Sequence, residues 1–104
     1  LNHINNGKLS LNQLMNFVCE NPVKIFGIKN KGFIKEGYDG DFTIVDMNKI
    51  IEIKNENIES KCKWSPFNGY KFKGTPTHTI IFGKIKMKDG IIIGDPTGKP
   101  LNFN

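Results

Sequence analysis

Helical and β structure meet between two runs of this sequence, Asn21-Pro22-Val23-Lys24-Ile25-Phe26-Gly27 and Gly37-Tyr38-Asp39-Gly40-Asp41-Phe42-Thr43-Ile44-Val45-Asp46. Asn21 suits a helix N-cap, and Pro22 then falls at the first helical position, where its missing N–H costs nothing. Gly27 can adopt the left-handed conformation that ends the turn. In the second run, Phe42 and Ile44 alternate with polar residues, which is the period of a half-buried strand. We therefore expect a short helix followed mostly by sheet.

An amphipathic helix is predicted upstream of this proline. Ser10 and Gln13 form a capping-box pattern, in which each side chain satisfies a backbone amide of the other. Apolar residues then recur at i, i+3, i+4 and i+7, with two further residues widening the stripe: Leu11, Leu14, Met15, Val18, Phe17 and Cys19. We expect this helix to end before Asn21-Pro22, because the residue before a proline avoids helical geometry. Its apolar side needs a partner to cover it.

The remainder of the chain is predicted to be mostly antiparallel sheet. Strands are expected at Phe42–Val45, Lys49–Lys54, Thr77–Phe82, Ile85–Lys88 and Ile91–Ile93. Asp89-Gly90 is a type I′ hairpin signal, and Gly83-Lys84 is expected to turn the chain. Pro66 indicates a loop between the second and third strands. The fold class predicted is therefore α+β, with the helix first.

The length and the charge of the chain exclude or disfavour several classes of protein. A chain of 104 residues fits one domain but not a (β/α)8 barrel, which needs about 250 residues. Leu1 is not an initiator Met, and no signal peptide or spanning apolar run follows, so we expect a piece of a longer or processed protein. The net charge of +5 comes from lysine alone, which favours scattered solvated positions over an Arg-based nucleic-acid surface. Cys19 and Cys62 lack metal-like spacing and predict a reducing, cytoplasmic location.

No residue pattern points to a metal or catalytic centre. His3 lies in a polar lead-in and His78 inside a strand, so His78 is interpreted as a core or interface side chain. Asp39 and Asp41 share a turn and could bind a cation, but further oxygen ligands are absent, and turn capping is the favoured interpretation.

Two serines and one aromatic group complete the candidates. Ser10 and Ser65 have no nearby histidine to act as base, so Ser10 is interpreted as a cap and Ser65 as a loop residue. Trp64, Phe67 and Tyr70 lie in sequence near four lysines, Lys61, Lys63, Lys71 and Lys73. Such a group could stack single-stranded nucleic acid, but an aromatic loop that plugs a sheet edge explains it equally well and is preferred.

The order of several motifs resembles the carboxyl-terminal end of a dihydroorotase of the amidohydrolase superfamily. The matching segments, which cover nearly the whole chain, are Gly7–Leu11, Glu20–Pro22, Phe26-Gly27, Gly32, Gly37–Asp41, Val45-Asp46, Lys63–Gly69, Lys73-Gly74 and Thr79–Lys84. The loop Trp64-Ser65-Pro66-Phe67-Asn68-Gly69 is closer to dihydroorotases than to allantoinases or dihydropyrimidinases, which share the layout.

This resemblance implies that residues 1–28 hold the last helix of a metal-dependent barrel, Ser10–Cys19, and a short following helix. It implies that residues 29–104 are the later part of a β-sandwich whose other strands come from the amino-terminal end of the family's chain. The family's zinc ligands have no counterpart here, so no catalytic, cofactor-binding or metal-ligating residue is carried over. Zinc-activated hydroxide would serve the intact enzyme, and this chain alone should be inactive.

The expected partners follow from the same comparison. We expect the chain to dock on the remainder of its parent or to self-associate, because a helix face and a sheet edge are left uncovered. A small-molecule substrate is expected only for the intact enzyme. A membrane is not an expected partner, and a small basic β module that binds single-stranded nucleic acid is kept as the alternative function.

Overall fold

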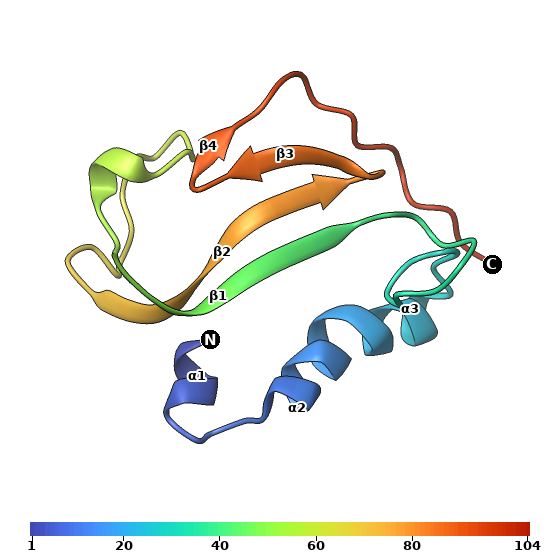
Figure 1. The fold of residues 1–104 in the computed structure, drawn as a ribbon, viewed down its shortest axis with the longest axis horizontal. Helices are drawn as coiled ribbons and strands as arrows, with labels where there is room; N and C mark the ends of the chain where they lie inside the picture. Colours follow the sequence, from blue (N-terminus) through green and yellow to red (C-terminus); the bar gives the residue numbers. More distant parts are fainter.

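The computed structural model describes residues 1–104 and separates a helical amino-terminal part from a four-stranded sheet (Figure 1). The elements in chain order are α1 (Asn2–Asn5), α2 (Leu11–Met15), the π-helical turn η1 (Asn16–Glu20), α3 (Asn21–Phe26), β1 (Phe42–Glu52), the 3₁₀ turn η2 (Asn55–Asn57), β2 (Lys71–Ile81), β3 (Lys84–Lys88) and β4 (Ile91–Ile92). The strands form an antiparallel meander in the order β1-β2-β3-β4. The predicted α+β class is confirmed.

The helical part is continuous through the proline, so the predicted break before Asn21-Pro22 is wrong. Ser10 caps α2 as expected, since its Oγ accepts from the Gln13 amide at 3.1 Å and the Gln13 side chain accepts from the Ser10 amide at 2.7 Å. Asn21 is itself helical, with φ −63° and ψ −44°, and is not an N-cap. Its amide donates to the Asn16 carbonyl five residues back, and this wider turn gives the Pro22 ring room beside the preceding turn. The predicted left-handed cap at Gly27 is confirmed, with φ 62°.

The first strand is longer than its sequence suggests. Phe42–Val45 and the following apolar run were expected to be separate strands, but both belong to β1, and β2 begins at Lys71 rather than Thr77. The register shifts between Asp46, which faces Thr75, and Ile50, which faces Lys73. Asp46 Oδ1 accepts from the amides of Asn48 and Lys49 at 2.8 and 3.0 Å. This irregularity lies opposite Gly74, and a second register shift, between Ile44 and Val45, lies beside Pro76. Together they let the ladder continue past these two residues.

Two tight turns connect the later strands. Asp89 and Gly90 both have positive φ, 49° and 82°, which confirms the predicted turn of type I′ character. The turn between β2 and β3 is centred on Phe82 and Gly83, with φ 49° and 74°, one residue earlier than expected. Phe82 therefore lies outside the strand and adopts a backbone conformation that is unusual for a bulky residue.

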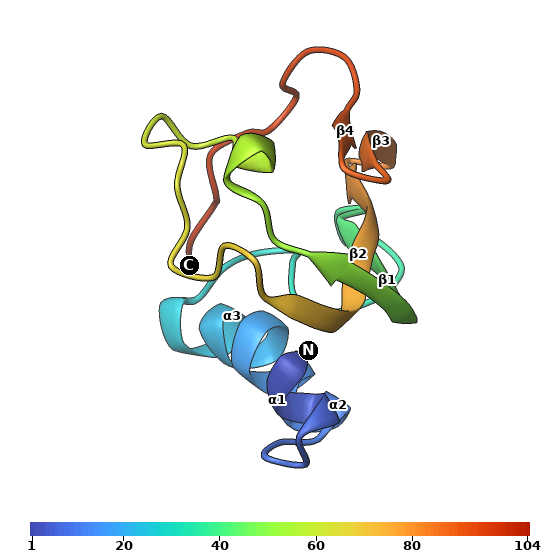
Figure 2. The same ribbon diagram turned by 90° about the vertical axis from the view of Figure 1, so that its left-hand side faces the viewer.

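The helices lie on the β1 side of the sheet (Figures 1 and 2), and each end of the helical part is held by a different contact. At one end, Leu1 packs on Gly74 of β2, and Asn5 Nδ2 donates to the Lys73 carbonyl at 2.6 Å. At the other end, the carboxy-terminal segment returns to the end of α3, where the Lys29 amide donates to the Asn102 carbonyl at 2.9 Å.

The chain leaves an unusually large surface exposed. Its accessible area is 8066 Å², and none of its hydrophobic residues is fully buried. A folded monomer of 11.8 kDa exposes about 5,900 Å², which leaves an excess of about 2,200 Å². The radius of gyration of 15.4 Å also exceeds the roughly 13 Å of a compact domain of this length. A core of its own is therefore largely missing.

Candidate functional site

The most highly connected group of charged side chains lies where the linker after α3 meets the sheet. Lys31 Nζ donates to Asp39 Oδ2 at 3.0 Å and to Asp41 Oδ2, and lies 4.8 Å from the centroid of the Phe82 ring. Asp41 Oδ1 accepts from the Phe82 amide at 2.8 Å. We call Lys31, Asp39, Asp41 and Phe82 the Lys31 cluster. It joins three segments: the linker, the start of β1 and the β2–β3 turn.

Electrostatics favours the charged forms of this cluster. The hydrogen bond to Asp41 is the main cause of a raised pKa for Lys31, against a desolvation that lowers it. Partial burial pushes the pKa of Asp41 up, but the Lys31 ammonium and the Phe82 amide outweigh it and hold that pKa below its usual value. Only 19% of the Lys31 side chain is exposed. The two carboxylates are thus satisfied by protein donors.

This arrangement decides between the two interpretations of the Asp39–Asp41 turn. Both carboxylates bind the same lysine instead of opening toward a cation. No group of three His, Cys, Asp or Glu side chains anywhere in the chain is arranged to hold a metal ion. The donor set of this chain therefore does not fit a zinc site.

A polar cleft of about 460 Å³ adjoins the Lys31 cluster. Its walls come from the linker, the β2–β3 turn and the carboxy-terminal segment: Lys29, Asn30, Lys31, Asp39, Phe82, Lys99, Pro100 and Asn102. Lys99 Nζ lies 5.4 Å from the centroid of the Phe82 ring, on which Lys31 also rests. The cleft contains no serine, threonine, cysteine or histidine.

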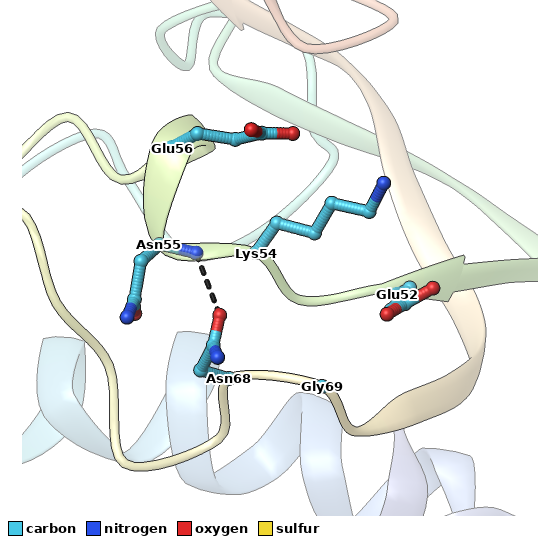
Figure 3. Close-up of a pocket in the computed structure, with 6 residues that line it drawn as sticks. All are labelled: Glu52, Lys54, Asn55, Glu56, Asn68 and Gly69. Carbon is cyan, nitrogen blue, oxygen red and sulfur yellow. Dashed lines mark hydrogen bonds between the residues drawn. The ribbon is translucent and has the colours of Figure 1, made fainter.

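A second hollow, of about 350 Å³, lies where β1 ends (Figure 3). Its lining is polar throughout: Glu52, Lys54, Asn55, Glu56, Asn68 and Gly69. Lys54 and Glu56 extend to the same side of the chain, while the Asn55 amide donates to Asn68 Oδ1 at 2.8 Å below them (Figure 3). This bond, with the Ser65 amide donating to Asn55 Oδ1 at 2.9 Å, ties the loop before β2 to the end of β1.

The two candidate histidines and the serines are not brought together. His3 lies in the short helix α1, which the sequence pattern did not predict. His78 is half-buried in β2, with its Nδ1 3.0 Å from Thr77 Oγ1. The Ser10 hydroxyl caps α2, and the Ser65 hydroxyl accepts from the Phe67 amide at 3.1 Å. Each serine has the role that its local sequence predicted.

The aromatic patch is only partly assembled. Phe67 and Tyr70 pack edge to face with centroids 6.1 Å apart, and Phe72 joins both rings at 6.1 Å. Trp64 pairs with none of them and is largely exposed. The three packed rings form a small cluster of their own where the loop enters β2.

Cys62 is exposed in the same loop. The Ser60 hydroxyl, 3.0 Å from its Sγ, is the main cause of a lowered pKa for this thiol. Cys19 is half-buried in η1, and the two cysteines are both free.

Much of the exposed apolar surface belongs to the helices and to β1. It includes the expected stripe of α2 and η1 and continues into the end of α3: Leu11, Met15, Phe17, Val18, Ile25 and Phe26. On β1, Phe42, Ile44 and Ile50 are exposed, and the outer edge of this strand has no neighbour. Exposed apolar residues in this number are typical of a surface that binds another polypeptide.

Comparison with known proteins identifies the class. Residues 1–86 match the model of the amidohydrolase family. The chain is 43% identical over 99 residues to a dihydroorotase of Pyrococcus furiosus, covering 95% of this chain and 24% of that protein. It is 46% identical over 82 residues to a dihydroorotase of Endomicrobium trichonymphae, covering 79% of this chain and 19% of that protein.

Solved structures agree with this class. L-hydantoinase (dihydropyrimidinase) from Arthrobacter aurescens superposes with a TM-score of 0.84 at 33% identity, over 90% of this chain and 21% of that one. A D-hydantoinase superposes with a TM-score of 0.82 at 31% identity, over 91% and 21%. The chain belongs to the amidohydrolase family, and it spans about a quarter of the length of the curated relatives it matches.

The structure contains no helix with the length and apolar character that a membrane span requires.

Proposed function

We propose that this chain is the carboxy-terminal scaffold portion of a dihydroorotase, the zinc-dependent hydrolase that interconverts N-carbamoyl-L-aspartate and dihydroorotate in pyrimidine biosynthesis. The observation that carries this proposal is the 43% identity to the Pyrococcus furiosus dihydroorotase over 99 residues. Further dihydroorotases, from Methanothermobacter thermautotrophicus and Pyrococcus horikoshii, are 36% and 41% identical over 86% and 95% of this chain.

In this proposal the chain has two parts with different partners. Residues 1–28 are the last helix of a (β/α)8 barrel with a short following helix, and residues 29–104 are the carboxy-terminal part of a β-sandwich. The apolar stripe of α2 and η1 and the open edge of β1 support this division, because each is a surface that another element would normally cover.

The partner for these surfaces is the remainder of the parent protein. The excess exposed area of about 2,200 Å² is well over twice the roughly 800 Å² that each side buries in a standard interface. Areas of that size belong to obligate contacts, which resemble a domain core divided between two pieces. The chain therefore acts by closing and supporting the catalytic barrel.

The chemistry is assigned to the rest of the enzyme. When bound in the intact enzyme, zinc would supply the Lewis acidity for hydrolysis of the cyclic amide. The side chains of this chain do not fit a zinc site, since no three ligating groups converge. None of these 104 residues is therefore assigned a role in the chemical step.

A related cyclic amidohydrolase, such as a dihydropyrimidinase or allantoinase, is the second candidate. The observation that favours it is the superposition on L-hydantoinase with a TM-score of 0.84 and 33% identity. We rank this candidate second because the sequence identity to dihydroorotases, 43% and 46%, is higher than the 33% to the L-hydantoinase.

Two chimeras test the proposal and its rival. This chain replaces the matching carboxy-terminal segment either of the Pyrococcus furiosus dihydroorotase or of the Arthrobacter aurescens L-hydantoinase, and each chimera is assayed on its parent's substrate with metal present. We expect the dihydroorotase chimera to retain the larger fraction of its parent's activity. The reverse order would favour the second candidate, and two folded but inactive chimeras would contradict a scaffold role.

Matched variants of the dihydroorotase chimera test the docking surface. Val18 lies on the exposed apolar stripe, whereas Asn12 lies on the polar side of the same helix. Val18→Glu should abolish activity, because it places a charge in the proposed interface. Asn12→Glu, which adds the same charge outside it, should leave activity near that of the unmodified chimera.

A further inference from the structure

We propose that the consecutive residues Lys31 and Gly32 form the lock that fixes the orientation of the helical part relative to the sheet. Lys31 binds the sheet through the Lys31 cluster, and Gly32 binds the helices through a close backbone contact. The inference concerns the junction within this chain and holds whichever cyclic amide the intact protein hydrolyses.

The helix side of the lock is a steric fit. A Cβ built at Gly32 would lie 2.8 Å from the Cys19 carbonyl oxygen and 3.2 Å from Val23 Cβ, and closer still to Val23 Cγ2. Gly32 also has a φ of 81°, which favours glycine. Only a residue without a side chain lets the linker lie this close to η1 and α3.

The sheet side of the lock is electrostatic. Lys31 reaches both carboxylates of the Asp39–Asp41 turn, and Asp41 in turn holds the Phe82 amide at 2.8 Å. Beside this bond, the Gly83 amide donates to the Gly40 carbonyl at 2.8 Å. Lys31 therefore binds the start of β1 and the β2–β3 turn as one unit.

Few other contacts join the helices to the sheet, so the contacts of Lys31 and Gly32 have a large effect on their relative orientation. At the far end of the helices, the contact consists of Leu1 on Gly74 and the bond from Asn5 to the Lys73 carbonyl. The apolar stripe of α2 and η1 lies between these two ends and remains exposed. Before the chain meets its partner, the relative angle of its two docking surfaces thus depends on the linker and on the carboxy-terminal segment, whose Asn102 and Asn104 bond to Lys29 and Gly27 at the end of α3.

Pulsed electron paramagnetic resonance on the full chain tests this directly. Nitroxide labels are placed at Asn12→Cys in α2 and Lys84→Cys in β3, in a background with Cys19→Ser and Cys62→Ser. Labelled chain is diluted with unlabelled chain so that only distances within one molecule are measured. The unaltered junction should give a single narrow distribution of label distances.

Four substitutions then distinguish a change in the orientation of the helices relative to the sheet from a general loss of stability. Lys31→Met should broaden the distribution, and Lys31→Arg, which keeps the charge, should restore it. Lys35→Met removes an exposed lysine of the same linker, whose Nζ lies over the Tyr38 ring at 5.5 Å, and should leave the distribution narrow. Asp41→Asn keeps an oxygen for the Phe82 amide but weakens the ion pair, so it should also broaden the distribution.

The result that would overturn the inference is equally specific. If Lys31→Met and Asp41→Asn give distributions as narrow as Lys35→Met, the ion pairs do not orient the helices. If Lys31→Met loses the circular dichroism of the folded chain, Asp41→Asn alone decides. Because this experiment uses the chain without a catalytic partner, its outcome is independent of the activity of the chimeras.

Discussion

Replacing Gly32 by alanine should destabilise the chain far more than the same change at Gly37. The two glycines have the same φ of 81°, so alanine pays the same cost of left-handed geometry at both, about 1–2 kcal/mol. Gly37 has no atom within 4 Å of the added Cβ, whereas Gly32 faces the Cys19 carbonyl and the Val23 side chain. Overpacking of this kind adds roughly 1–3 kcal/mol. The difference between the two variants therefore isolates the contact.

Urea unfolding followed by far-ultraviolet circular dichroism measures this difference. We expect Gly32→Ala to lower the free energy of unfolding by about 2–5 kcal/mol, against about 1–2 kcal/mol for Gly37→Ala. With a urea dependence of about 2 kcal/mol per molar, a gap of 2 kcal/mol separates the two midpoints by about 1 M.

A double-mutant cycle identifies the neighbour that causes the strain. Val23→Ala removes the methyl groups that an alanine at position 32 would meet but leaves the Cys19 carbonyl in place. The double variant should therefore recover part of the loss, with a coupling free energy in the range of about 0.5–3 kcal/mol. Equal destabilisation at Gly32 and Gly37, together with zero coupling to Val23, would refute the close contact.

Three further predictions concern the cap, the ion pairs and the exposed surface. Ser10→Ala removes one half of the capping box and should cost about 1 kcal/mol of unfolding free energy, with a loss of helical circular dichroism; an unchanged signal would contradict the cap. Because the pKa of Asp41 is lowered, its stabilisation is present above pH about 4 and is lost as the pH falls through its folded pKa. Asp41→Asn should flatten this acid-side loss, by at most about 1 kcal/mol because the Asp41 carboxylate is partly exposed beside Lys31 and Asp39. An unchanged pH profile would count against the ion pairs. The isolated chain should self-associate in sedimentation experiments, because its apolar stripe is uncovered, and a compact monomer at all concentrations would contradict this.

Local patterns predicted the elements that depend on neighbouring residues. The capping box of Ser10, the left-handed Gly27 and the Asp89-Gly90 turn are each fixed by a few adjacent side chains and dihedral angles, and each was predicted correctly. The strand bounds failed where a distant partner decides. The irregularity after Asp46 in β1 carries the ladder past Gly74 of β2, and no local signal in either segment reveals this pairing.

The Lys31 cluster likewise could not be predicted from local sequence patterns. The sequence singled out Asp39 and Asp41 as a turn that could bind a cation, and the turn interpretation was preferred. It did not reveal that Lys31 would fill the space between the carboxylates, because the linker could have directed any of several lysines there. The place of Phe82 was missed for a related reason: its left-handed conformation is held by Asp41, 41 residues away.

The role proposed for this chain is to support a catalytic barrel without carrying any of its chemistry. The most direct test is an assay of dihydroorotate hydrolysis by the purified 104-residue chain, with and without added zinc. We expect a rate no different from that of the buffer under both conditions, since no set of ligating side chains converges in the fold. Zinc-dependent turnover by this chain alone would contradict the supporting role, because it would require an active centre within these residues.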